Sequence, residues 1–250
     1  MERTVQTLRH PPLLETALSV IVEIPMLKMD DVGHFVADVV PDFKMTREFV
    51  QQTFTLDFGK ISSQSISPIP TGRQYMKDKN LVLMIQNRSD KAVEFVFSVL
   101  PPYTKWSDLY NTATPILDGF CNTFHVNQIK RIGVRSINRL FAPYNGCPVV
   151  DIIKTVPADV GTLPTPLVQA FNYQDTMYYK EFDLCATVIR VTNPDAKDPR
   201  FSMILDSDVF TPSNHSYMIS DIKPVLGKIV TLKDEIFFGS VGDKCMEGLK

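Results

Sequence analysis

Arg131, Arg135 and Arg139 recur at every fourth residue of segment 129–140, and these three side chains are well suited to binding chemistry. Side chains alternate between the two faces of a β-strand, so this spacing places all three guanidinium groups on one face. At about 3.3 Å per residue they form a row roughly 26 Å long. Guanidinium groups bind carboxylates and phosphates through paired hydrogen bonds. The row therefore predicts either ion pairs with carboxylates of the same protein or a site for an external anion, a nucleic-acid phosphate included.

Two further residues of this segment bear on binding. Gly133 lies between Arg131 and Arg135, where the missing side chain lets a ligand or another backbone approach closely. Asn138 falls on the opposite face of the strand and serves a different environment. The candidate ligand-binding residues are Arg131, Arg135, Asn138 and Arg139.

Asp206 and Asp208 share one face of a second predicted strand. Like charges at that spacing repel one another unless a cation lies between them. Three outcomes are open: ion pairs with the arginine row, exposure to solvent, or ligation of a divalent metal such as Mg²⁺ through oxygen ligands. A metal held by carboxylates beside arginines would be the minimum equipment for phosphoryl chemistry.

The sequence lacks the motifs by which common enzymes are recognised. It contains no Walker A loop, no dinucleotide-binding glycine pattern, no nucleophile elbow and no His-Glu-x-x-His. Its four cysteines are widely spaced and its four histidines are scattered, which predicts reduced thiols rather than disulfides or a zinc site. These absences disfavour an enzyme and predict no cofactor apart from Mg²⁺ at the aspartates.

Composition indicates a folded protein away from membranes. Of the 250 residues, 44% are hydrophobic and 22% charged, as is usual for a globular chain with a sizeable core. The net charge of −2 argues against a constitutive binder of nucleic acid or of membrane surfaces. The first residues lack a signal-peptide pattern, and the apolar stretch that follows is too short and too charged to span a bilayer. The expected location is the cytoplasm.

Periodicity in the first half of the chain predicts strands followed by a long helix. Apolar residues alternate with polar ones over residues 14–24, which is typical of a half-buried strand. The Ser/Pro-rich stretch 61–72 predicts an exposed loop. Segments 81–86 and 92–100 flank a turn and predict a hairpin. Over residues 106–124 apolar side chains recur every three to four positions, which predicts an amphipathic helix.

The second half repeats this order in part. Residues 167–192 and 201–210 predict strands, and a helix with apolar residues in phase over 226–237 ends the chain. The predicted class is α+β, with antiparallel sheets each packed by a long helix, and the recurrence suggests two similar halves. The predicted division is an N-terminal α+β half over residues 1–145, a connection over residues 146–166 and a C-terminal α+β half over residues 167–250.

Five stretches, in this order and spacing, resemble one family over nearly the whole chain. They are Pro12–Ala17, Pro102–Trp106, Arg131–Arg139, Leu205–Phe210 and Leu232–Phe238. The family is a group of sporadically distributed proteins of bacteria and archaea. Ser136 and Asp234 stand where that family has tyrosine and asparagine. The resemblance implies a soluble cytoplasmic protein and transfers no activity. Sporadic distribution is typical of genes that move horizontally, so it suggests association with phage defence or a toxin–antitoxin system.

Three functions therefore remain open. The leading hypothesis is a non-catalytic binding or regulatory protein that holds an anionic ligand or a protein partner against the arginine row. The second is a Mg²⁺- or Mn²⁺-dependent enzyme that acts on a phosphorylated or nucleotide substrate through Asp206 and Asp208. The third is a structural module that forms homo-oligomers through its apolar C-terminal helix.

Overall fold

A computed structural model describes residues 8–51, 54–55, 64–65, 69–102, 105–144, 146–154, 170–192, 201–213 and 215–250. Five α-helices lie within these ranges: α1 (Met29–Val39), α2 (Trp106–Thr123), α3 (Val149–Ile152), α4 (Ile222–Ser240) and α5 (Asp243–Leu249). A 3-10 turn, η1 (Ile219–Asp221), leads into α4. Among the helices in these ranges, none combines the length and the apolar character that crossing a membrane requires.

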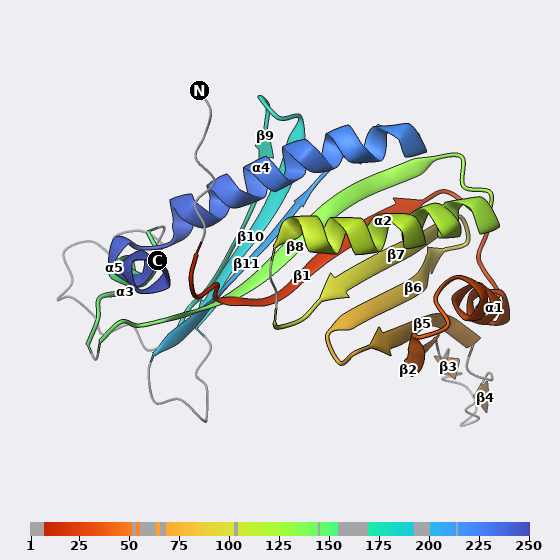
Figure 1. The fold of residues 1–250 in the computed structure, drawn as a ribbon, viewed down its shortest axis with the longest axis horizontal. Coiled ribbons are helices and arrows are strands. Elements are labelled where there is room, and N and C mark those ends of the chain that lie inside the picture. Colours follow the sequence, from red (N-terminus) through yellow and green to blue (C-terminus); the bar gives the residue numbers. More distant parts are fainter. Residues whose placement is uncertain are drawn as a thin grey trace. The chain divides into compact units, whose positions relative to one another are not determined.

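Strands make up the rest of the regular structure (Figure 1). Within the described ranges, nine of them are joined by hydrogen bonds in the order β2-β5-β6-β7-β1-β8-β11-β10-β9, and β3 pairs with β4 separately. Their bounds are β1 (Leu13–Val22), β2 (Lys44–Gln51), β3 (Phe54–Thr55), β4 (Gln64–Ser65), β5 (Ile69–Lys77), β6 (Leu81–Ser89), β7 (Ala92–Val99), β8 (Ile129–Phe141), β9 (Asn172–Tyr179), β10 (Leu184–Thr192) and β11 (Ser202–Phe210). The antiparallel pairing of strands such as β6–β7 and β10–β11, together with the helices, confirms the α+β class.

Backbone contacts divide the chain into two units. Unit 1 comprises residues 1–16, 133–212 and 223–250, and unit 2 comprises residues 17–132 and 213–222. Strands β1 and β8 each contribute residues to both units. The boundary between residue 132 of unit 2 and residue 133 of unit 1 therefore lies inside β8. The connection predicted over residues 146–166 is described only as far as residue 154, where α3 forms part of unit 1.

The stretch predicted to be a loop is partly a strand. Residues 69–72 begin β5, where Pro70 pairs with Val50 of β2 next to an irregularity in the register. Proline is tolerated at such a position because β2 is the edge strand and the ladder is already interrupted there. The remainder of the predicted loop, apart from residues 64–65, lies outside the described residues.

Unit 2 is built around a cluster of aromatic side chains. Phe120 of α2 lies with its ring centroid 5.4 Å from Phe95 of β7 and 5.8 Å from Phe35 of α1. Phe124 completes the cluster at 5.0 Å from Phe120. The three-to-four spacing of apolar residues in the helix explains this packing, because it gathers those side chains on one face. Helix α2 thus forms where the sequence predicts it, with Pro115 inside it.

Unit 1 contains the strands β9, β10 and β11 together with α4. Side chains of β10 alternate strictly, so that Leu184, Ala186, Val188 and Arg190 are buried. Several apolar positions of α4 are buried as well, among them Leu226, Ile229 and Leu232. Arg190 is the one charged residue among these buried positions of β10. A buried charge needs partners, which the surrounding structure must supply.

Candidate functional site

The arginine row lies on β8 with the alternation that the sequence predicts. On one face Ile132, Val134 and Leu140 are fully buried. On the other, Arg131 and Arg139 are half-buried and Arg135 is exposed. Although the three arginines share a strand face, they belong to different surroundings, because Arg131 falls in unit 2 and the other two in unit 1.

Arg135 is engaged by carboxylates of unit 1. Its Nε donates to Oδ1 of Asp206 at 2.9 Å, and its Nη2 donates to Oδ2 of the same side chain. Asp208 lies directly opposite Arg135 in the β8–β11 register. The hydrogen bond to Asp206 raises the pKa of Arg135; burial opposes the rise, and the charges of Asp206, Asp208 and Glu15 add to it. An external anion at Arg135 would therefore meet three carboxylates.

The ion pair with Arg135 also bears on Asp206, one of the two predicted metal ligands. Of the three outcomes left open for Asp206, the ion pair with the arginine row is the one observed. Within the described ranges, no cluster of three or more His, Cys, Asp or Glu side chains is arranged to hold a metal ion. The ion pair with Arg135 links Asp206 of β11 to β8.

Replacing Arg135 by alanine leaves the Asp206 side chain, 9% exposed, without its guanidinium partner. Breaking a fully buried pair in this way costs roughly 3–5 kcal/mol. Because the Arg135 side chain is 51% exposed, water screens the pair, and we expect a loss of about 1–2 kcal/mol in the free energy of unfolding. Urea denaturation of Arg135→Ala measures it.

The exposed pair of Lys105 and Asp108, whose charged atoms are 3.8 Å apart, supplies the matched control. Lys105→Ala should change the free energy of unfolding by less than about 0.5 kcal/mol. Equal stability of the two variants would contradict a structural role for the Arg135–Asp206 pair.

Arg131 takes part in a polar network of unit 2. Its Nη1 donates to Oγ of Ser19 at 3.4 Å, and that hydroxyl donates to Oε1 of Glu94 at 2.7 Å. Glu94 is buried, and its second oxygen lies 2.7 Å from Nη2 of Arg88. The network joins β8, β1, β7 and β6 within one unit, so Arg131 contributes to holding these strands together.

Asn138 lies on the buried face of β8, away from the arginines. Its side chain is 4% exposed, and its Nδ2 donates to the carbonyl oxygen of Leu205 at 3.5 Å. Since buried amides need hydrogen-bond partners, this contact gives Asn138 a place in the core of unit 1.

Arg139 lines a cavity of about 560 Å³ in unit 1, which we call the Arg139 cavity. The N-terminal segment, the end of β8 and α5 form its walls. The other lining residues are His10, Pro11, Pro12, Leu13, Leu14, Phe141, Ala142, Pro143, Cys245, Gly248 and Leu249. Among these described residues, two can carry positive charge, Arg139 and His10, and none is acidic. The cavity thus combines an apolar wall with a cationic group.

Backbone hydrogen bonds hold the walls of the Arg139 cavity in place. The amide of Arg139 donates to the carbonyl oxygen of Pro12 at 2.8 Å, which ties β8 to the chain just before β1. The amides of Arg9 and His10 donate to the carbonyl oxygen of Leu249 at 3.0 and 3.3 Å, which ties the same segment to the end of α5. Three segments far apart in the sequence therefore meet at this site.

The two buried thiols are poorly suited to nucleophilic chemistry. All four cysteines are free. Burial raises the pKa of Cys245, in the wall of the Arg139 cavity, to about 11, and the pKa of Cys121 to about 12. Since the thiolate is the reactive form, both side chains are protonated and weakly reactive at neutral pH.

No family model matches the chain, and a search of curated proteins finds no significant similarity. Sequence reasoning identified Arg139 but missed His10 and Cys245, because neither lies in a recognisable motif.

Proposed function

We propose that this protein is a cytoplasmic binding protein whose unit 1 holds an amphipathic anion in the Arg139 cavity. The ligand class is a carboxylate or a phosphate attached to an apolar body. Its charged group would be bound by Arg139, with His10 as a second basic side chain in the wall. The apolar part would lie against residues such as Leu14, Phe141 and Leu249.

One observation carries this proposal: Arg139 lines a mainly apolar cavity whose described lining contains a second basic side chain, His10. Charge-assisted hydrogen bonds to a carboxylate or phosphate are stronger in such surroundings than in water. Apolar walls with a few polar groups that fix orientation are also the usual character of small-molecule sites.

The other arginines of the row support the choice by contrast. Arg135 already makes two hydrogen bonds to Asp206, and Arg131 contacts the Ser19–Glu94 network. An anion at either position would have to compete with carboxylates of the protein. The described lining of the Arg139 cavity presents an apolar wall and a second basic side chain, His10.

Binding, rather than covalent chemistry, is the role that the thiol at this site favours. The Cys245 thiol has a pKa raised to about 11 and donates weakly to the carbonyl oxygen of Phe141, with its sulfur 3.8 Å from that oxygen. A protonated, buried thiol of this kind acts as part of an apolar wall.

Replacing Arg139 by glutamine tests the proposal with 1-anilinonaphthalene-8-sulfonate, a fluorescent anion with an apolar body. The wild-type protein should bind the dye and enhance its fluorescence. In Arg139→Gln we expect the affinity to fall about tenfold or more, because a hydrogen bond to a charged group contributes about 1.5–3 kcal/mol. Titration of fluorescence against dye concentration measures the change.

Arg131→Gln provides the matched control, since it removes the same charge from the same strand outside the cavity. It should leave dye affinity unchanged. Equal affinity in wild type, Arg139→Gln and Arg131→Gln would contradict the proposal, provided that circular dichroism shows all three to be folded.

A further inference from the structure

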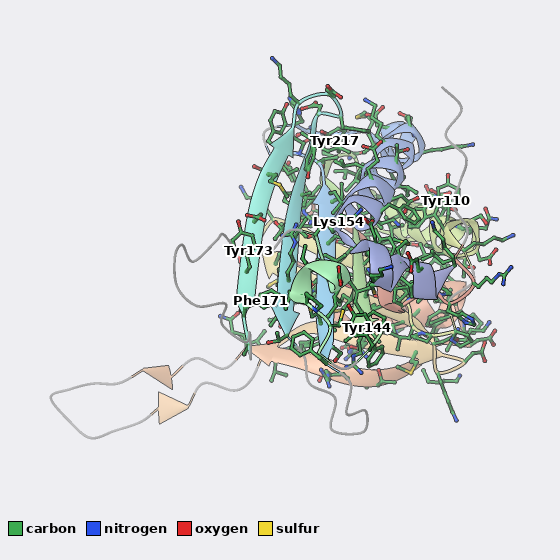
Figure 2. All side chains as sticks on the ribbon, turned by 90° about the vertical axis from the view of Figure 1, so that its left-hand side faces the viewer. Tyr110, Tyr144, Lys154, Phe171, Tyr173 and Tyr217 are labelled. Carbon is green, nitrogen blue, oxygen red and sulfur yellow. The ribbon has the colours of Figure 1, made fainter. Side chains whose placement is uncertain are left out.

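Strand β9 lies at one end of the strand order, and among the described strands only β10 pairs with it. Figure 2 shows β9 beside β10, with Tyr173 marking the strand. The pairing with β10 runs from Asn172 to Tyr179 without a shift in register. A regular edge strand of this kind presents a row of backbone donors and acceptors to a further strand that comes alongside.

The hydrogen-bond pattern shows which backbone groups of β9 point away from β10. The amide of Thr192 donates to the carbonyl oxygen of Phe171 at 3.1 Å, so these residues form a hydrogen-bonded pair that continues the β9–β10 register. Such pairs alternate along an antiparallel ladder, so the odd-numbered residues of 173–179 also face β10. The even-numbered residues direct their N–H and C=O groups outward, and no other described strand meets them. They are Asn172, Gln174, Thr176 and Tyr178.

The outward edge of β9 lacks the features that keep an edge strand unpaired. It contains no lysine, arginine or proline, and its one charged residue, Asp175, forms an ion pair with Arg190 of β10. The even-numbered side chains are exposed and uncharged. Strand β2, at the other end of the order, carries Lys44, Arg47 and Glu48 and shifts its register against β5 twice. Charges and bulges of that kind protect natural sheet edges from pairing, so β2 is protected and β9 is open.

We infer that β9 pairs with β9 of a second copy of this chain, in antiparallel orientation about a two-fold axis, and that the chain therefore forms a dimer. The axis passes beside Thr176, so that Thr176 faces its own counterpart and Gln174 faces Tyr178 of the second copy. Each of these pairs exchanges two hydrogen bonds, because the even-numbered residues point outward in both copies. The pairing uses up the same edge in both chains, so association stops at two.

Asp175 decides the register of this pairing. An axis beside Asp175 would place its carboxylate directly opposite the same carboxylate of the second copy, and like charges at that position are unfavourable. An axis beside Thr176 places Asp175 opposite Met177 and keeps residues 173–179 of both copies paired. The exposed side chains that then face each other are uncharged and form Thr–Thr and Gln–Tyr pairs, which can hydrogen-bond across the strands.

A second copy suits this edge better than a free peptide does. The β9 strand of another chain is already extended and held by its own β10, whereas a free peptide loses conformational entropy when it is ordered on the edge. The inference goes beyond the function proposed above and is independent of the Arg139 cavity, because none of the described residues that line that cavity belongs to β9.

Sedimentation equilibrium of the full chain tests the dimer. The wild-type protein should approach twice the chain mass of 28.3 kDa, with a dissociation constant of about 0.1 mM or tighter. Thr176→Pro removes an outward N–H at the centre of the interface, at an edge position where proline is tolerated, and should weaken the dimer at least about tenfold. Thr176→Val is the matched control. It keeps that N–H and likewise lacks the hydroxyl that contacts Thr187 at 3.1 Å, so it should dimerise like the wild type.

Disulfide cross-linking tests the register and does not require the proline variant to fold. Opposed residues of a hydrogen-bonded pair have Cα atoms about 5.5 Å apart, a distance that a disulfide spans. Thr176→Cys should therefore form a covalent dimer on oxidation. In Gln174→Cys the two new thiols would lie roughly 14 Å apart along the strands, so this variant should cross-link no more than the wild type, whose four cysteines are free.

A wild-type chain that stays monomeric at about 0.5 mM overturns the inference. It is also overturned if folded Thr176→Pro dimerises as tightly as Thr176→Val, or if Thr176→Cys and Gln174→Cys cross-link to the same extent. If Thr176→Pro fails to fold, the comparison of the two cysteine variants decides.

Discussion

Replacing Phe120 by alanine is expected to remove about 4 kcal/mol from the free energy of unfolding. The Phe120 side chain is fully buried, and its ring contacts three other phenylalanine rings of unit 2. Truncation leaves a cavity that α2 and β7 cannot close without moving the remaining rings. Native domains have stabilities of about 5–15 kcal/mol, so this single change should leave the protein close to unfolding. Urea denaturation followed by far-ultraviolet circular dichroism measures the loss.

Phe238→Ala is the control, because it deletes the same atoms from a half-buried position on α4. Its expected cost is about 1 kcal/mol, since partial exposure reduces both the transfer and the cavity contributions. If Phe120→Ala were no less stable than Phe238→Ala, the aromatic cluster could not be the centre of the unit 2 core.

Gly242→Ala is expected to cost about 3 kcal/mol or more, for a different reason. A Cβ atom at Gly242 would lie 2.2 Å from the carbonyl oxygen of Asp151 and 2.3 Å from its carbonyl carbon. Because these are backbone atoms, no side-chain rotation relieves the clash. The chain between α4 and α5 would have to move away from α3, which would break the hydrogen bond from the Gly242 amide to the carbonyl oxygen of Ile152, 2.8 Å long.

The same variant connects stability to binding. Helix α5 begins directly after Gly242 and carries Cys245, Gly248 and Leu249 into the wall of the Arg139 cavity. Gly242→Ala should therefore weaken dye binding as well as stability. Gly248 lies on the same helix, and a Cβ atom added there would meet nothing within 4 Å. Gly248→Ala should therefore have the same urea midpoint of unfolding as the wild-type protein. Equal stability of Gly242→Ala and Gly248→Ala would contradict the close contact between Gly242 and the backbone of Asp151 in α3.

Local periodicity predicts several elements of this fold because the responsible interactions are local. Alternation over 129–140 gives β8 with the arginines and the buried residues on the expected faces. Apolar spacing over residues 106–124 gives α2. In both segments the hydrophobic pattern and the burial agree, since side-chain direction follows directly from the backbone period.

Elements that depend on distant partners are not visible in the sequence. Strand β2 is exposed along nearly its whole length and lacks a clear pattern, so only its pairing with β5 defines it. The start of β5 was predicted to be a loop because serine and proline are typical of loops, yet it pairs at the sheet edge. Pairing between remote strands overrides such local preferences.

The candidate sites show the same limit more strongly. The Arg139 cavity needs residues near positions 10, 140 and 247 to meet, and hydrogen bonds of the backbone bring these segments together. Sequence spacing identified the arginines but could not distinguish their environments. Arg139 lines a mainly apolar cavity, and Arg135 forms an ion pair with Asp206. That distinction arises from the register of β8 with β11.

We propose that the Arg139 cavity selects an apolar molecule by its negative head group. Calorimetric titration of the wild-type protein with dodecyl phosphate and with dodecylamine, both kept below their micelle concentrations, tests it most directly. We expect the phosphate to bind, the amine to bind at least about tenfold more weakly, and Arg139→Gln to abolish the difference. Equal affinity for the two head groups in the wild-type protein would contradict it.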